Sequence, residues 1–87
     1  MEQAEDVQVG KVTHYFAKIG VAVIEVTDGT IKAGDKIHIK GKTSDFWQNA
    51  VSMQMEHENV QVAQPGNIIA MKVEEAVREN DGVYKQI

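Results

Sequence analysis

Apolar and polar residues alternate along several short stretches of this chain, which is the pattern of half-buried β-strands. The clearest stretch reads Lys-Ile-His-Ile-Lys over residues 36–40. In a strand, its two isoleucines point to one face and its three cationic side chains to the other. The turn signal Ala-Gly-Asp at residues 33–35 precedes it, and Gly41 ends it. We therefore predict a strand with one apolar and one cationic face.

Further strands are predicted before this one. Residues 7–16 alternate with a slip of one position at Gly10-Lys11, where a β-bulge is expected. Residues 19–26 are almost continuously apolar and β-branched, as in a strand buried on both faces or inside a small barrel. An Asp-Gly turn within residues 27–30 leads from this strand to the next.

The segment after Gly41 allows two interpretations. From Phe46 to Val51 the apolar residues have helical spacing, whereas from Val51 to Met55 they alternate with polar residues as in a strand. We predict a strand over about residues 49–57. The remaining elements are an extended piece at 60–62, a turn at 64–67, a strand at 68–73, one helical turn at 74–78 and a closing strand at 83–85.

Six or seven short strands separated by turn signals indicate an all-β barrel or sandwich. The length of 87 residues and the 43% apolar content fit one globular domain, with residues 1–6 as a flexible leader. The chain has no cysteine, which excludes disulfides and fits a cytoplasmic protein. No apolar run approaches the roughly 18 residues of a membrane span, so no membrane association is expected.

Charge is unevenly distributed along the chain, although the net charge is only −4. Four lysines and one aspartate give residues 31–42 a charge of +3, which leaves −7 for the rest. The candidate nucleic-acid-binding residues are cations of this segment: Lys36, His38, Lys40 and Lys42. The first three lie about 7 Å apart along one strand face, which is close to the spacing of phosphates on a nucleic-acid strand. The alternative is a solvated face, on which lysines prevent edge-to-edge pairing.

Two adjacent aromatic residues, Phe46 and Trp47, are candidates for a protein-interaction site. Neighbouring residues of a strand point to opposite faces, so one of the two is exposed if this piece is extended, unless a partner covers it. The alternative is that both lie in a loop folded over the mouth of a barrel.

The turn and strand motifs recur in a recognisable order over about residues 8–86. They are Gly10-Lys11-Val12, Ile19–Val26, Ile31–Ile39, Val51–Met55, Pro65–Ile68 and Gly82-Val83-Tyr84. This order resembles the second, β-barrel domain of the translational GTPases, typified by elongation factor Tu. It is similar also to stand-alone translation elongation factor-like proteins and to the C-terminal barrel of some collagenase-like peptidases. The resemblance implies a small closed or nearly closed antiparallel β-barrel of about six strands, of the translation-factor type, over residues 7–87.

The resemblance does not extend to the family's chemistry. The chain has no Gly-x-x-x-x-Gly-Lys-Ser/Thr loop, so it is not expected to bind GTP by itself. Elongation factor Tu uses a Glu-x-His-Arg arrangement to hold the aminoacyl end of tRNA. This chain has Gln54, Glu56 and His57 at the matching positions, and these residues do not carry that role over.

Catalytic and metal-binding residues are not predicted. The chain has three histidines but neither a cysteine nucleophile nor a serine within Gly-x-Ser-x-Gly. Residues 56–58 read Glu-His-Glu, but neighbours on a strand point to opposite faces and do not converge on a metal. We therefore expect no enzymatic activity and no cofactor.

Two functions remain after these exclusions. The first is a non-catalytic translation-factor-like module that binds tRNA, other RNA or a ribonucleoprotein such as the ribosome through the cationic strand face. The alternative is a protein-interaction module, an accessory barrel that docks onto a separate enzyme such as a peptidase. An exposed Trp47 would belong to the second function, and the four cations to the first.

Overall fold

The computed structural model describes residues 6–86 as an antiparallel all-β structure, with no helix in that range. The predicted all-β class is thus confirmed. Within the same range no helix is long and apolar enough to cross a membrane. The strands are β1 (Asp6–Phe16), β2 (Val21–Val26), β3 (Ile31–Lys32), β4 (Lys36–Lys40), β5 (Asp45–Asn49), β6 (Gln54–Met55), β7 (Glu58–Asn59), β8 (Val62–Ala63), β9 (Ile68–Lys72) and β10 (Gly82–Gln86).

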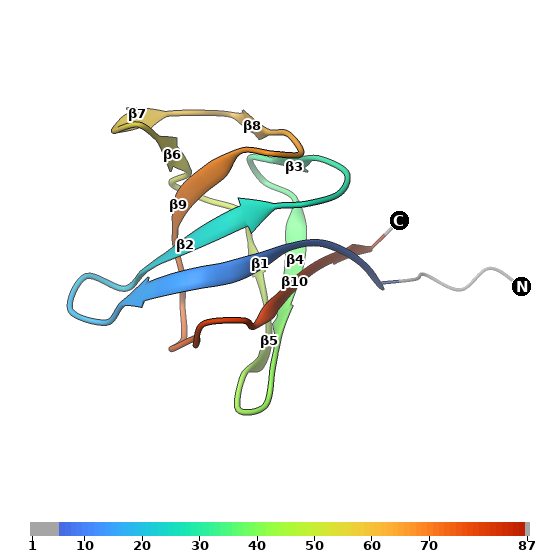
Figure 1. Ribbon diagram of the computed structural model, residues 1–87, viewed down its shortest axis with the longest axis vertical. Helices are drawn as coiled ribbons and strands as arrows, with labels where there is room; N and C mark the ends of the chain where they lie inside the picture. The colour runs from blue at the N-terminus through green and yellow to red at the C-terminus, as the bar shows by residue number, and fades with distance from the viewer. Residues whose placement is uncertain (1–5, 87) are drawn as a thin grey trace, which may run out of the picture.

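One curled sheet holds eight of these strands in the order β5-β4-β10-β1-β2-β9-β6-β7, and β3 pairs with β8 separately. The six strands of five or more residues are consecutive in that order and form the wall of the barrel (Figure 1). The long β1 crosses the barrel and pairs with β2 on one side and β10 on the other. The beginning and the end of the described chain therefore lie side by side, with Asp6 opposite Gln86.

The core is built from side chains on the inner face of the long strands. In β2 every second residue is buried, and in β4 both isoleucines are fully buried. The large side chains with the lowest exposure are Val12, Ile24, Val26, Ile31, Ile37, Ile39, Ile69, Met71 and Val83. Burying a side chain of this kind contributes about 1.5–3 kcal/mol to the free energy of unfolding, so this cluster drives closure of the sheet.

Side chains, rather than a strand ladder, join the two edges of the barrel. Gln48 on β5 is 4% exposed and donates from its amide nitrogen to the carbonyl oxygen of Lys72 (2.9 Å). Its amide oxygen accepts from the backbone N–H of Glu74 (2.8 Å). Ser44 donates to the carbonyl oxygen of Ala76 (3.3 Å). We call these contacts the Gln48 seam, and they make the barrel nearly closed.

The segment between β4 and β6 differs from both interpretations of its sequence. The helix is wrong because β5 is a strand, and the strand predicted at residues 49–57 is broken at Ala50. The backbone N–H of Ala50 donates to the carbonyl oxygen of Asp35 (2.7 Å), and its own carbonyl oxygen accepts from Gly34 (2.8 Å). The chain is thereby tied to the turn before β4, and Ser52, with a φ of 53°, follows the break.

The helical turn predicted at residues 74–78 does not form. The backbone N–H of Glu74 donates to Gln48, and that of Arg78 donates to the carboxylate of Asp81 (3.0 Å). Both groups are thus engaged outside any helix, and tertiary contacts override a weak local preference.

The first strand begins earlier and bulges one position earlier than predicted. It starts at Asp6, which was assigned to the leader, whereas residues 1–5 of that leader lie outside the described residues. Its register against β10 shifts between Gln8 and Gly10. A Cβ at Gly10 would lie 2.6 Å from the carbonyl oxygen of Glu25, so close approach of β2 explains the glycine.

Candidate functional site

A row of aromatic rings crosses the outer face of β5, β4 and β10. Strand pairing places Trp47 opposite His38 and His38 opposite Tyr84. The rings of Trp47 and His38 are stacked, with centroids 4.3 Å apart and planes inclined by 14°. Tyr84 lies on the other side of His38 at 6.5 Å, and the ammonium group of Lys36 lies 5.6 Å from the indole centroid. We call these four residues the Trp47 surface.

Two carboxylates hold His38 in place. Its Nε2 lies 2.5 Å from Asp45 Oδ1 and its Nδ1 lies 3.1 Å from Asp6 Oδ2, so a protonated imidazole donates to both. Burial by itself lowers the pKa of His38, but the hydrogen bonds to Asp45 and Asp6 outweigh burial and raise the pKa above 6.5. The side chain bridges β1, β4 and β5 and fixes the ring on which Trp47 stacks.

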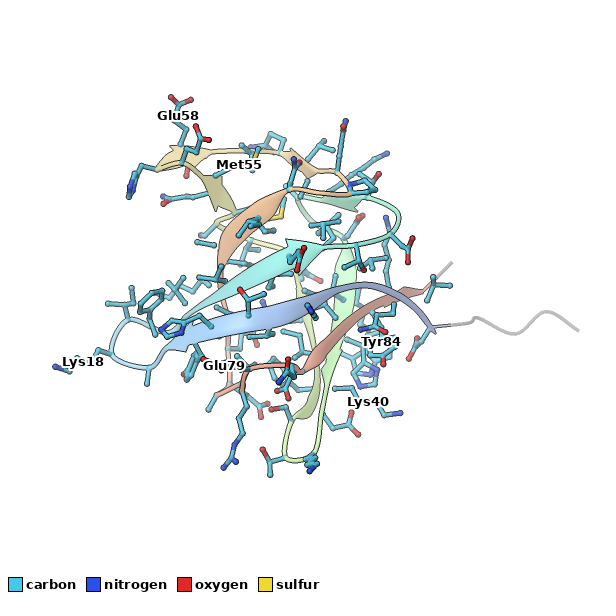
Figure 2. All side chains as sticks on the ribbon, in the orientation of Figure 1. Lys18, Lys40, Met55, Glu58, Glu79 and Tyr84 are labelled. Carbon is cyan, nitrogen blue, oxygen red and sulfur yellow. The ribbon has the colours of Figure 1, made fainter. Side chains whose placement is uncertain are left out.

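We expected three exposed cationic side chains along β4, and this expectation is wrong for the middle one, His38. His38 is 8% exposed, because Trp47 covers its ring and the two aspartates occupy its nitrogens. Lys36 and Lys40 are exposed at the two ends of the strand. Lys40 and Tyr84 lie on the same side of the barrel (Figure 2). Two lysines and two carboxylates therefore share this face, which lowers its net positive charge.

Lys42 is not part of the β4 face. It lies in the loop after β4 and lines a concavity together with the turn at residues 78–81. The structure thus brings Lys36, His38 and Lys40 together on one strand and places Lys42 in a different setting.

The adjacent aromatic residues separate as an extended backbone requires. Phe46 is 7% exposed and packs in the core, whereas Trp47 on the opposite face is 37% exposed. The alternative in which both lie in a loop is wrong. Only Trp47 is therefore available as an interaction residue.

Sequence reasoning missed the two aspartates and Tyr84 as members of this site. Asp6 falls within the expected leader, and Asp45 lies in the segment after Gly41 for which the sequence allows two interpretations. The side-chain partners of His38 cannot be read from one strand alone, because its two hydrogen bonds join residues 32 and 7 positions apart in the chain. The remaining signal was the strand alternation that places Asp45 and Trp47 on one face.

The other histidines lie apart from this site. His14 on β1 contacts the ring of Phe16 at 4.5 Å and lies 3.4 Å from Glu79. Glu56 and His57 form the two-residue turn between β6 and β7, with φ values of 53° and 68°. Within residues 6–86 no three His, Cys, Asp or Glu side chains are arranged to hold a metal ion.

This barrel is similar in fold to solved structures. It matches two structures of the C-terminal domain of a Geobacillus thermoleovorans protein assigned as a U32 peptidase, with TM-scores of 0.85 and 0.82. The first match covers 91% of this chain and 99% of that domain at 21% sequence identity. The fold is that of this C-terminal domain. The fold class expected from the sequence is therefore confirmed.

The chain is also similar in sequence to curated proteins that are named as a protease and a collagenase. The chain is 38% identical over 79 residues to an uncharacterized protease of Methanocaldococcus jannaschii, covering 90% of this chain and 19% of that protein. It is 34% identical over 82 residues to a collagenase of Porphyromonas gingivalis, covering 93% of this chain and 20% of that protein. The chain spans about a fifth of the length of these relatives. No family model matches it.

These matches bear on the three resemblances drawn from the sequence. They support the likeness to barrels of collagenase-like peptidases. They give no support to the likeness to translational GTPases. The alternative function, an accessory barrel, is therefore better supported than a translation-factor-like module.

Proposed function

We propose that this chain is a non-catalytic accessory barrel that docks onto a peptidase-type domain. The proposal rests on one observation, which is how much of this chain and how much of each relative the matches cover. Nine-tenths of this chain corresponds to about a fifth of proteins named as a protease and a collagenase, so most of each relative has no counterpart in this chain.

The Trp47 surface is the docking surface that we propose. Trp47 is exposed, yet its ring is held against His38, so little side-chain freedom is lost when a partner covers it. Tryptophan and tyrosine are common among the residues that dominate interface energies. The exposed Lys36 beside the indole adds a charged group at the rim.

A binding experiment with the M. jannaschii relative tests the proposal. The partner is that protein without the segment matching this chain, and isothermal titration calorimetry measures the affinity. We expect wild-type binding and a loss of about tenfold or more for Trp47→Ala, since buried interface tryptophans contribute about 2 kcal/mol or more. Ile68→Ala, at a residue that is 57% exposed on β9, is the matched control and should leave the affinity within about twofold.

Two results would contradict this proposal. Absence of binding by the wild-type barrel would argue against docking onto a peptidase-type domain. Binding that is equally strong for Trp47→Ala would leave docking in place but remove the Trp47 surface from it. A chimera in which this chain replaces the matching segment provides a second readout, because docking should raise its melting temperature and Trp47→Ala should lower it again.

RNA binding on the same face is a second candidate, favoured by the stacked indole between exposed lysines. Aromatic rings that stack bases and cations that contact phosphates are the usual features of single-strand binding. Fluorescence anisotropy with tRNA and a random single-stranded RNA at several salt concentrations tests it. Binding that weakens with salt, and is lost when Lys36 and Lys40 are changed to Glu, would favour this function. Absence of binding at low salt would exclude it.

A further inference from the structure

A concavity of about 430 Å³ lies between two loops that are far apart in the sequence. One wall is the start of the loop after β4, and the other is the turn before β10. The lining residues are Gly41, Lys42, Arg78, Glu79, Asn80 and Asp81. Its volume falls within the usual range for small-molecule sites. Arg78 is the only arginine of the chain.

The turn that forms one wall is rigidly held. Asp81 is 5% exposed; its carboxylate accepts from the backbone N–H of Arg78 (3.0 Å), and its own N–H donates to the carbonyl oxygen of Arg78 (3.1 Å). The backbone of the turn is also joined to Val12 of β1 by two hydrogen bonds, from Asn80 to Val12 (2.7 Å) and from Val12 to Asp81 (2.8 Å). Asn80 has a φ of 75°, a conformation that costs free energy and is maintained by these contacts.

The opposite wall approaches this turn as closely as a glycine permits. A Cβ at Gly41 would overlap the carboxylate of Asp81. The backbone N–H of Gly41 donates to the carbonyl oxygen of Ser44 (2.7 Å), which fixes the loop that carries Lys42. The backbones bearing the two cations are therefore preorganised relative to each other, although the cationic side chains themselves are exposed.

The acidic side chains of the concavity already have partners, whereas its two cationic side chains do not form ion pairs with any residue that the structure describes. Its formal charges cancel, but the two acidic side chains already have contacts: Asp81 binds backbone, and Glu79 lies 3.4 Å from Nδ1 of His14. Within residues 6–86, Lys42 and Arg78 form no ion pair. Lys42 and Arg78 are therefore the two charged side chains of this lining that an entering anion can contact without breaking an ion pair, and Glu79 and Asp81 are their acidic neighbours in the concavity.

We propose that this concavity binds the phosphate group of a phosphate monoester through Arg78 and Lys42. A guanidinium group binds two oxygens of one anion side by side, and an ammonium group binds a further oxygen. A phosphate monoester presents three terminal oxygens and a charge of about −1.5 to −2 near pH 7, which matches these donors better than a carboxylate does. The remaining space accommodates the organic part of a small molecule.

This site can be tested by titrating anions into the isotope-labelled chain and monitoring its amide chemical shifts by NMR. The probes are inorganic phosphate and glycerol 3-phosphate, and acetate at matched ionic strength is the control anion. We expect saturable shifts at residues 41–42 and 78–81 with a dissociation constant on the order of 1 mM. Tighter binding of glycerol 3-phosphate would identify an organic monoester as the ligand, and equal binding would identify the phosphate group alone.

Variants distinguish binding at a specific site from nonspecific attraction of anions to surface lysines. Arg78→Gln and Lys42→Gln should each weaken phosphate binding about fivefold or more while leaving the other amide shifts in place. Lys18→Gln, in the turn between β1 and β2, should change nothing (Figure 2). Shifts that do not saturate, shifts of the same size with acetate, or unchanged binding by Arg78→Gln and Lys42→Gln would overturn the proposal.

Discussion

The Gln48 seam can be tested by removing one side chain. Gln48 supplies both a donor and an acceptor to the segment after β9, at 2.9 Å to Lys72 and 2.8 Å to Glu74. No strand ladder joins β5 to that segment in the described sheet. If the Gln48 seam holds the barrel nearly closed, Gln48→Ala should lower the free energy of unfolding by more than the substitution of an exposed polar residue does.

The expected loss follows from the contacts. Each hydrogen bond contributes about 1 kcal/mol, which gives about 2 kcal/mol for the two shorter bonds. Loss of the buried aliphatic part of the side chain adds to this. Lys72 and Glu74 are exposed residues, so water reaches their freed backbone groups and limits the further penalty. We therefore expect a decrease of about 2–3 kcal/mol in the free energy of unfolding.

Urea denaturation followed by circular dichroism measures this change. Gln48→Met keeps most of the volume but removes both hydrogen bonds, so it should retain most of the destabilisation. Gln54→Ala is the matched control, because Gln54 is exposed and makes one side-chain bond, at 3.2 Å to Asn59. Its effect should stay within about 0.5 kcal/mol. If Gln48→Ala were no more harmful than Gln54→Ala, or Gln48→Met were harmless, the seam would not be a hydrogen-bonded closure.

Two further predictions concern His38 and Gly41. Because the folded state raises the pKa of His38, the stability that this residue provides is fully present below about pH 6.5 and is lost as the pH rises through the folded-state pKa. The difference in unfolding free energy between wild type and His38→Gln should therefore shrink from about pH 6 to pH 9, and a growing difference would contradict the argument. The fluorescence of Trp47, the only tryptophan, should titrate with a midpoint above 6.5 in wild type and not in His38→Gln. Gly41→Ala should lower the free energy of unfolding by about 1–3 kcal/mol, because its Cβ must displace the Asp81 carboxylate from the N–H of Arg78; a thermal melt unchanged from wild type would show that Asp81 moves freely.

The sequence determined those features of this protein that depend on local alternation and turn chemistry. The isoleucines of β4 are buried and the lysines at its ends are exposed, because side chains of a strand alternate between two faces whatever the partner strand. The separation of Phe46 from Trp47 follows from the same rule once that piece is extended. The turns predicted at residues 33–35 and 64–67 are also confirmed. The structure has turns at residues 33–34 and 65–66, in which Gly34 and Gly66 take a positive φ.

Only the tertiary structure decided what surrounds those side chains. Alternation placed His38 on the cationic face, but the carboxylates of Asp6 and Asp45 and the ring of Trp47 come from other strands and bury it. The break at Ala50 likewise depends on backbone groups that lie 15 residues earlier in the chain, at Asp35. Such contacts arise when the sheet curls and brings distant segments together, and no single stretch of sequence contains them.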